Sequence, residues 1–460
     1  MVLNTALFKY RKTPLFCVLA SIILYAIFAY NLVRTEALKL VSLYLLLFAF
    51  AYILKKSAGF NFRFLVIASI LLRLVFLVAT PNLSQDFYRF IWDGRMLLEG
   101  FNPYLYTPES FINEAVFPIN QAQELYNGMG ELNGSHFTNY PPLNQLCFYI
   151  AAVLSNDSIT GAIITFRILI IAADIGTLYY GKKLLEGLKL PSSNIWFYIL
   201  NPFIIIELTG NLHFEGVMLF FLIWSLYLLH KGNWKWAAVI FACSISVKLI
   251  PLLFLPLFFW WFLDKKDIET STLKKRTHLV LFYTLVGVTV VALFLPFFSM
   301  EFVTNYAETI GLWFSNFEFN ASIYYIAREI GYAITGYNEI YYIGKILPII
   351  VIIITLGYTF LKKNNSIKIL ISSMVIVFTY YLFLSTTVHP WYIASPLILC
   401  VFTNYRFPVI WSLAIILSYL AYLSIGNASK SENLWVISLE YLIVFSSFIW
   451  EVFLRRKIKI

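Results

Sequence analysis

The sequence predicts an all-helical, polytopic membrane protein. Hydrophobic residues make up 60% of the 460 residues and charged residues only 13%, whereas a soluble domain carries about 25% charge. The mean hydropathy is +0.77. The apolar residues form long continuous stretches, unlike the alternating strands of an outer-membrane barrel. Together these observations exclude a soluble enzyme, a disordered chain and a nucleic-acid-binding domain.

We expect about 14 transmembrane helices, because a span needs about 20 apolar residues. The candidate spans, in chain order, are 14–33, 37–54, 62–80, 159–185, 191–208, 213–231, 234–248, 249–263, 277–298, 341–361, 367–387, 391–404, 407–426 and 434–454. Lys9, Arg11 and Lys12 precede the first span, and the positive-inside rule therefore predicts a cytoplasmic N-terminus. An even number of crossings of the inner membrane then makes both termini cytoplasmic. The same rule explains the net charge of +10 without a nucleic-acid partner.

Residues 142–156 leave two topologies open. They can form a full span, with 234–263 crossing once as one long helix. Alternatively they only dip into the membrane, and 234–248 and 249–263 cross separately. The dipping scheme leaves more Lys and Arg on the cytoplasmic side, and the positive-inside rule therefore favours it.

In the favoured scheme the polar parts of the chain converge on the outer side of the membrane. These parts are the loop 81–158, the turn 209–213, Lys248, the aromatic segment 299–340 and His389. The residue types capable of chemistry therefore meet at one surface, where we expect the active site.

The clearest local pattern begins at Asp86. If 86–98 is helical, Asp86, Arg89 and Asp93 share one face by their spacing. A carboxylate in the first turn, at the outer membrane surface, can act as a general base toward a hydroxyl. Arg89 and Arg95 can hold phosphate oxygens. The alternative is a surface amphipathic helix with Asp–Arg pairs and aromatic anchors.

Two further motifs place ionisable residues within apolar surroundings, where they are costly and often functional. His213 and Glu215 follow a turn between two candidate spans. They can form a proton site, or they can be a helix cap and one hydrogen-bonded histidine without a chemical role. Lys248 lies between two apolar runs. It can bind a lipid phosphate, pair with a carboxylate such as Glu207, or extend to the interface.

Aromatic residues interleaved with amides mark the segment 312–325, which includes Trp313 and Asn320 and is followed by Arg328. Such faces suit sugar rings or prenyl chains, although an interfacial amphipathic helix gives the same pattern. His389 lies where another span meets the outer surface.

These motifs together resemble the GT-C superfamily of integral-membrane glycosyltransferases, and more narrowly the bacterial polyprenyl-phosphate-mannose-dependent mannosyltransferases. The resemblance rests on D-x-Y-R-x-x-W-D-G-R from Asp86, then G-x-N-P-Y and Y-P-P-L. It is extended by G-N-x-H-x-E, V-K-x-x-P and H-P-W-Y in the expected order. It covers most of the chain after about residue 62.

The resemblance implies a GT-C-like module with a large first outer loop. The expected division is 1–61 as two additional N-terminal helices, 62–298 as the catalytic module with outer loop 81–158, 299–340 as an outer aromatic loop, and 341–460 as a variable set of helices. The resemblance maps the essential Asp onto Asp86. Phe87 and Tyr88 follow it instead of a second acid, which favours a metal-independent branch without cofactors.

The expected reaction transfers one sugar, by preference mannose, from a polyprenyl phosphate to a hydroxyl on the outer face, with inversion. The acceptor is a glycan, glycolipid or glycoprotein, and the oligomeric state stays open. Asp86 is the expected general base. The expected donor-phosphate residues are Lys248, Arg89, Arg328 and His389. The residues expected to orient the acceptor or the base are His213, Glu215, Asp93, Arg95, Tyr140, Asn320 and Trp313.

Two other classes were weighed. A transporter or flippase of a lipid-linked sugar would use intramembrane charges as a substrate path, but the halves show no clear repeat. Arg167 and Asp174, seven apart on one span, are instead expected to form a structural pair. A surface-polysaccharide polymerase or ligase would rely on arginine-rich outer loops, and 299–340 carries only Arg328.

Overall fold

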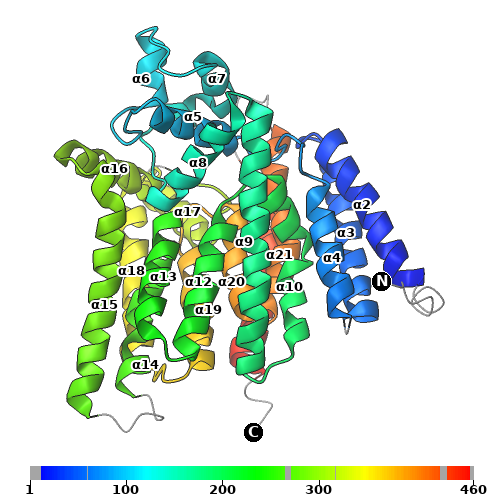
Figure 1. Ribbon diagram of the computed structural model, residues 1–460, viewed down its shortest axis with the longest axis vertical. Helices are drawn as coiled ribbons and strands as arrows, with labels where there is room; N and C mark the ends of the chain where they lie inside the picture. Colours follow the sequence, from blue (N-terminus) through cyan, green and yellow to red (C-terminus); the bar gives the residue numbers. More distant parts are fainter. Residues whose placement is uncertain (1–11, 60, 265–270, 316, 425–431, 456–460) are drawn as a thin grey trace.

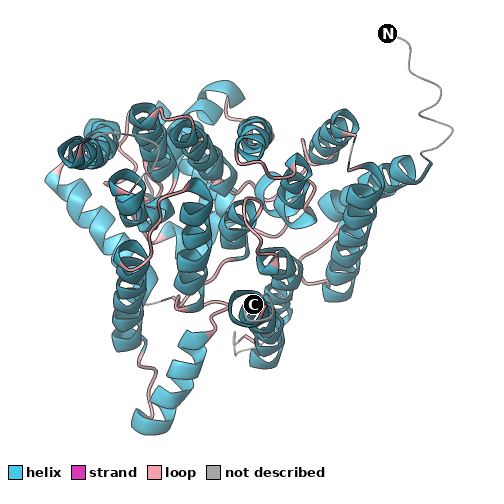
Figure 2. Ribbon diagram, turned by 90° about the horizontal axis from the view of Figure 1, so that it is seen from below, coloured by secondary structure: helices cyan, strands magenta, loops and turns pink. Residues whose placement is uncertain are grey.

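The protein is built of helices, as its composition predicts. The computed structural model describes residues 12–59, 61–264, 271–315, 317–424 and 432–455. Within these ranges the only β-type pairing is an isolated bridge between Phe319 and Thr387, and Figure 2 shows helices and loops alone. Helices satisfy their own backbone hydrogen bonds, which a chain surrounded by lipid requires.

The first half of the chain runs from an N-terminal helix pair through the segment 81–158 into the bundle. Its helices are α2 (Lys12–Asn31), α3 (Ala37–Ala58), α4 (Phe62–Leu74), α5 (Asp86–Leu98), α6 (Pro108–Asn113), α7 (Ala122–Gly134), α8 (Pro142–Ser155), α9 (Ile159–Gly187), η1 (Ser192–Ile195), α10 (Trp196–Ile199), α11 (Pro202–Ile204), η2 (Ile205–Gly210), α12 (Glu215–His230), α13 (Trp234–Val247), η3 (Ile250–Phe258) and α14 (Phe259–Leu263).

The second half begins with a long helix and ends with another. Its helices are α15 (Thr272–Phe294), η4 (Leu295–Phe297), α16 (Met300–Ser315), α17 (Ile323–Thr335), α18 (Ile340–Phe360), α19 (Ile367–Phe383), η5 (Pro390–Ile393), α20 (Ala394–Cys400), α21 (Phe407–Ala414), η6 (Ile415–Ser424), α22 (Leu434–Ile449) and η7 (Trp450–Leu454).

The expected count of about 14 transmembrane helices is not supported. Among the described residues, six helices are long and apolar enough to cross a membrane. A seventh is added if α11–η2 and α12, which meet at 115°, form one broken span. The other apolar stretches are shorter helices of 10–17 residues. An apolar run does not reveal where prolines and turns interrupt it: the predicted span 391–404, for example, is split between η5 and α20.

The interruption of the predicted span 62–80 shows how a buried charge compensates for a broken helix. Helix α4 ends at Leu74, and the guanidinium of Arg167 donates hydrogen bonds to the carbonyls of Phe76 and Leu77 just beyond that end. Arg167 also donates to the carbonyls of Thr209 and Gly210, each at 2.9 Å. A cation suits these carbonyl-rich helix ends.

The expected pair of Arg167 with Asp174 is therefore wrong. The partner of Asp174 is Arg73 on α4, with Nε 2.7 Å from Oδ2 and both side chains buried. Arg73 also donates to the carbonyl of Ile199. The seven-residue spacing within one helix favoured Arg167 as the partner of Asp174. In the structure Arg73, from α4, pairs with Asp174 instead, and Arg167 donates to backbone carbonyls.

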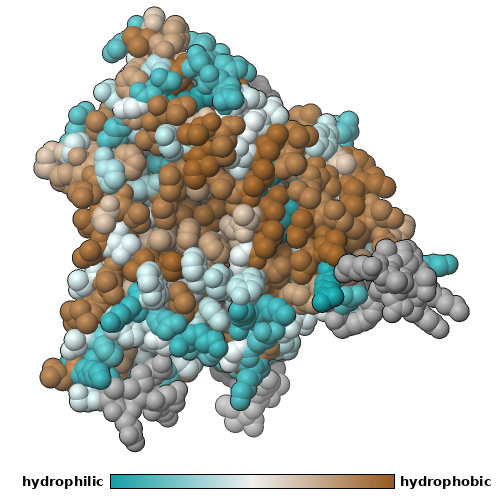
Figure 3. Space-filling model, in the orientation of Figure 1, coloured by the Kyte–Doolittle hydropathy of each residue, from teal (hydrophilic) through white to brown (hydrophobic). Residues whose placement is uncertain are grey.

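The molecule has a polar cap at one end of an apolar belt. Figure 1 shows α5, α6 and α7 above the bundle, with α8 beneath them and α16 beside the upper end of α15. Figure 3 shows a hydrophobic belt between more hydrophilic ends. Helix α8 has 14 residues, about 21 Å at the usual rise, and a bilayer core is about 30 Å thick. Helix α8 is therefore shorter than a full span, as are α13 and the η3–α14 segment, and the dipping topology stays a prediction.

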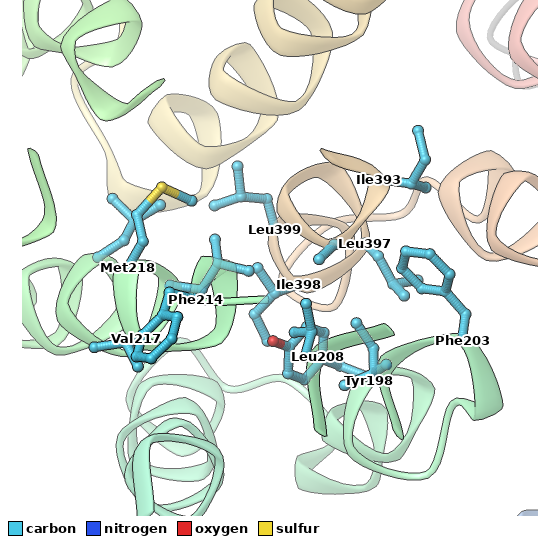
Figure 4. Close-up of a cluster of buried hydrophobic side chains, with 14 of the residues drawn as sticks. Tyr198, Phe203, Leu208, Phe214, Val217, Met218, Ile393, Leu397, Ile398 and Leu399 are labelled. Carbon is cyan, nitrogen blue, oxygen red and sulfur yellow. The ribbon is translucent and has the colours of Figure 1, made fainter. Parts of the chain in front are cut away.

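The core beneath the cap joins the α11–α12 region to η5 and α20. Figure 4 shows Phe203, Leu208 and Phe214 against Leu397 and other apolar side chains. Each of these residues is at most 1% exposed. This packing fixes two chain segments, 203–218 and 393–399, which carry or adjoin several of the predicted site residues.

Candidate active site

One cavity brings together polar residues from segments far apart in the sequence. Its empty volume is about 820 Å³, including space open to solvent. Its lining residues are Asp86, Asn139, Tyr140, Pro141, Lys248, Leu249, Ile250, Ile310, His389, Trp391 and Tyr392. Four of them, Asp86, Tyr140, Lys248 and His389, were predicted from the sequence as site residues. The predicted convergence of Asp86, Lys248 and His389 is thus realised in one cavity.

Asp86 is the first residue of α5 and is partly buried. The positive end of the helix dipole favours an anion at this position. Asn133 Nδ2 donates to Asp86 Oδ1 at 3.4 Å. Burial raises the pKa of Asp86, and Lys248 and the Asn133 hydrogen bond offset part of that rise. The result is a stronger base than an exposed aspartate, held at the wall of a cavity.

Lys248 follows the last residue of α13 in an extended conformation, with φ −149° and ψ 144°. Its Nζ lies 2.5 Å from Oε1 of Glu215 and 5.8 Å from the ring centroid of Tyr140. Glu215 is fully buried in the first turn of α12, where the helix dipole favours a carboxylate. The Lys248 side chain is 17% exposed, and the residue lines the cavity.

Glu215, not Glu207, is the partner of Lys248. Glu207 lies in η2 and instead accepts a hydrogen bond from Tyr419 OH at 2.7 Å. Its other oxygen lies 3.8 Å from Nε2 of His213. Sequence proximity did not distinguish the two glutamates, because the π-helical turn and the break before α12 point them to different sides.

His389 and His213 belong to one stack of rings. The ring centroids of His213 and Trp391 are 3.6 Å apart, and those of Trp391 and His389 are 4.6 Å apart. Burial, with the charge of Lys248, lowers the pKa of His389 to about 3. His389 is therefore neutral at pH 7 and can offer a phosphate one N–H donor but no charge.

Three predicted site residues on α5 have partners within the protein and do not line the cavity. Arg89 Nε lies 2.8 Å from Asp93 Oδ1, and Gln145 donates to the other oxygen of Asp93 at 3.0 Å. Arg95 donates to the carbonyls of Asn120 and Asp157. These contacts tie α5 to later parts of the segment 81–158 and hold the helix that carries Asp86.

Two predicted residues of the aromatic segment, Arg328 and Asn320, do not line the cavity. Arg328 pairs with Glu318 at 2.9 Å and Glu329 at 3.0 Å. Asn320 is fully buried, and its Nδ2 donates to Glu440 at 3.2 Å. The side chain of Trp313 lies outside the described part of the structure. The roles assigned to these residues stay predictions.

Several residues that line the cavity were not predicted from the sequence. Asn139 precedes the predicted Tyr140, and Trp391 and Tyr392 follow His389 in H-P-W-Y. Ile310 comes from the buried face of α16, which Tyr306 ties to Asn139 by donating to its carbonyl at 3.2 Å. Extending each motif by one or two neighbours would have found the first three, whereas no local signal identifies Ile310.

Metal binding was not expected from the sequence, and the geometry offers no obvious cluster. Across the described ranges, no group of three or more His, Cys, Asp and Glu side chains is arranged to hold a metal ion. The expectation of a metal-independent reaction stays a prediction.

Comparison with known proteins places the chain in a family. Residues 15–264, more than half of the chain and including α2 and α3, match the family model described as "Alpha-(1->6)-mannopyranosyltransferase, N-terminal domain". Two curated relatives are named alpha-(1->6)-mannopyranosyltransferase A. The one from Corynebacterium glutamicum is 25% identical over 43% of this chain and 40% of its own length. The one from Mycobacterium tuberculosis is 22% identical over 40% of this chain and 34% of its own length.

The matched segment thus spans less than half the length of either relative. The segment 15–264, which matches the family model, contains Asp86, Tyr140 and Lys248, which line the cavity, and Glu215, which pairs with Lys248. The family match confirms the resemblance to membrane mannosyltransferases of the GT-C kind that the motifs indicated. The chain is a helical, multi-pass membrane protein that belongs to the alpha-(1->6)-mannopyranosyltransferase family.

Proposed function

We propose that this protein transfers a single mannosyl group from a polyprenyl-phosphate donor to a hydroxyl of a glycan or glycolipid acceptor, on the outer face of the inner membrane. The observation that carries the proposal is that Asp86 and Lys248 line the same cavity at the polar end of the molecule. A displacement with an anionic leaving group is accelerated by a base that takes the proton of the attacking hydroxyl and by a fixed cation that stabilises the charge of the leaving group. The family match supports mannose as the sugar.

The proposed reaction is one direct displacement at the anomeric carbon. Asp86 takes the proton of the acceptor hydroxyl as its oxygen bonds to that carbon. The bond between the carbon and the phosphate oxygen breaks, and the electron pair leaves with the polyprenyl phosphate. Because direct displacement inverts the anomeric carbon, an α-linked product requires a β-linked mannosyl phosphate.

Lys248 is the proposed group that stabilises the leaving phosphate. Charge develops on the phosphate oxygen as its bond breaks, and a cation fixed beforehand lowers the barrier without reorganisation. Glu215 holds Lys248 from its buried side, 2.5 Å away, which leaves the cavity side for the phosphate. In this scheme Glu215 is a positioning residue for Lys248 rather than a group that contacts the acceptor.

Donor and stereochemistry can be tested together on the purified protein in detergent. Radiolabelled β-mannosyl polyprenyl phosphate is supplied with a mannoside acceptor, and release of polyprenyl phosphate and the configuration of the product are followed. A nucleotide-activated mannose serves as the contrasting donor. We expect turnover with the lipid donor and an α-linked product. Turnover with the nucleotide donor alone, or a β-linked product, would contradict the proposal.

A further inference from the structure

The cavity wall at His389 and Trp391 is the middle of a stack of aromatic rings, one end of which lies in the core. Phe319 and His389 have ring centroids 5.5 Å apart at 29°. His389 and Trp391 are 4.6 Å apart at 7°, and Trp391 and His213 are 3.6 Å apart at 20°. Three chain segments, around 213, 319 and 389–391, therefore meet through near-parallel rings.

Only the middle of this stack borders the cavity. His389 and Trp391 are lining residues, whereas His213 and Phe319 are not. His213 is 1% exposed. A substrate in the cavity therefore meets His213 only through Trp391.

The buried end of the stack, His213, lies beside the buried carboxylate of Glu207. Tyr419 donates to Glu207, whose second oxygen lies 3.8 Å from Nε2 of His213. Figure 4 shows Phe214 and Leu208, which flank His213 in sequence, packed in the core with Leu397 and its neighbours. The segment of His213 and the segment after Trp391 cannot shift independently in so dense a core.

The other end of the stack is held by backbone hydrogen bonds. The amide of Phe319 donates to the carbonyl of Thr386 at 3.1 Å, and the amide of Val388 donates to the carbonyl of Phe319 at 2.8 Å. His389 follows directly after this pairing. The imidazole is therefore fixed by its backbone on one side and by the indole of Trp391 on the other.

We propose that His213 is a positioning residue of the donor site: its ring sets the plane of Trp391, and through Trp391 that of the His389 imidazole at the cavity wall. This inference rests on the proposed function and takes His389, which lines the cavity, to contact the mannosyl polyprenyl phosphate, as expected from the sequence. The stacking of the ring, rather than the proton of His213, carries the effect.

The test compares a variant that keeps an aromatic ring with one that does not. His213→Phe retains a ring against Trp391, and His213→Leu fills similar space without one. A stacked aromatic contact corresponds to about a threefold to tenfold change in an equilibrium. We therefore expect His213→Leu to raise the KM for mannosyl polyprenyl phosphate about threefold to tenfold. His213→Phe should keep the KM within about twofold of the wild-type value.

The split between KM and kcat distinguishes positioning from a general loss of structure. A contact made equally in the ground and transition states changes KM and leaves kcat nearly unchanged. The matched control is Tyr180→Leu, which removes a ring stacked on Trp224 at 5.1 Å and 12°. These residues lie on α9 and α12 and do not line the cavity. We expect this control to lower the melting temperature without changing the KM.

Phe319→Leu keeps the inference testable if His213→Leu fails to fold. It removes the ring from the opposite end of the stack, and we expect the same rise in KM. An unchanged KM in a folded His213→Leu variant would overturn the inference, as would a His213→Phe variant whose KM rises as much as that of His213→Leu. Absence of wild-type turnover with this donor would refute the proposed function instead, so the two failures are distinguishable.

Discussion

Replacing Lys248 by methionine should separate the stability that its ion pair provides from its role in the cavity. The change leaves the fully buried Glu215 without its cation. Removing one partner of a buried pair typically costs about 3–5 kcal/mol of unfolding free energy. The variant also loses the proposed stabilisation of the leaving phosphate, a loss commonly of about 10²–10³-fold in kcat.

A double variant distinguishes these two effects. Lys248→Met with Glu215→Gln removes both charges and keeps the shapes of the side chains, so most of the lost stability should return. Its kcat should stay as low as that of Lys248→Met. Thermal unfolding in detergent and single-turnover release of polyprenyl phosphate measure the two quantities. A double variant with the wild-type kcat would refute the role of Lys248, and a Lys248→Met variant of unchanged stability would refute the importance of the pair.

Three other predictions follow from the geometry. Asp86 must be deprotonated to act, and burial raises its pKa. In the pH–rate profile, kcat/KM should therefore rise with pH through a midpoint above the pKa of an exposed aspartate, about 3.9. Because Lys248 lowers the pKa of Asp86, Lys248→Met should move this midpoint to higher pH. Arg73→Leu should lower the unfolding free energy by about 3–5 kcal/mol by leaving Asp174 unpaired, and adding Asp174→Asn should restore most of it in thermal unfolding; no recovery would contradict the pairing. Arg167→Leu should lower the unfolding free energy by about 1–3 kcal/mol for each carbonyl left without a donor. Arg167→Lys should recover only part of this loss in thermal unfolding, because an ammonium group lacks the planar, several-donor geometry of the guanidinium. Full recovery by lysine would show that the charge alone matters.

The sequence predicted the class of fold but not the division of its apolar stretches. Composition and continuous apolar runs are enough for a helical membrane protein, because only helices satisfy the backbone within such runs. The number of spans could not be predicted, since an apolar run gives no sign of a turn to whose carbonyls a distant side chain donates hydrogen bonds. Arg167 does so for the end of the predicted span 62–80, from a helix about 90 residues later in the chain.

The sequence could predict which motifs lie on the same side of the membrane, and so which residues could share one site. Asp86, Lys248 and His389 were expected on the same side, and they line one cavity. Partners could not be predicted, because they depend on side-chain direction. The π-helical turn of η2 directs Glu207 toward Tyr419, and Glu215 in α12 meets Lys248.

The turnover of Asp86→Asn tests the central claim most directly. The variant keeps the shape of the side chain and removes its capacity to take a proton, so kcat should fall about 10²–10⁴-fold while the melting temperature stays close to that of the wild type. Glu131→Gln, an exposed acid on α7 in the same outer loop, is the matched control and should keep the wild-type rate. A folded Asp86→Asn variant that transfers mannose at the wild-type rate would contradict the assignment of Asp86 as the base.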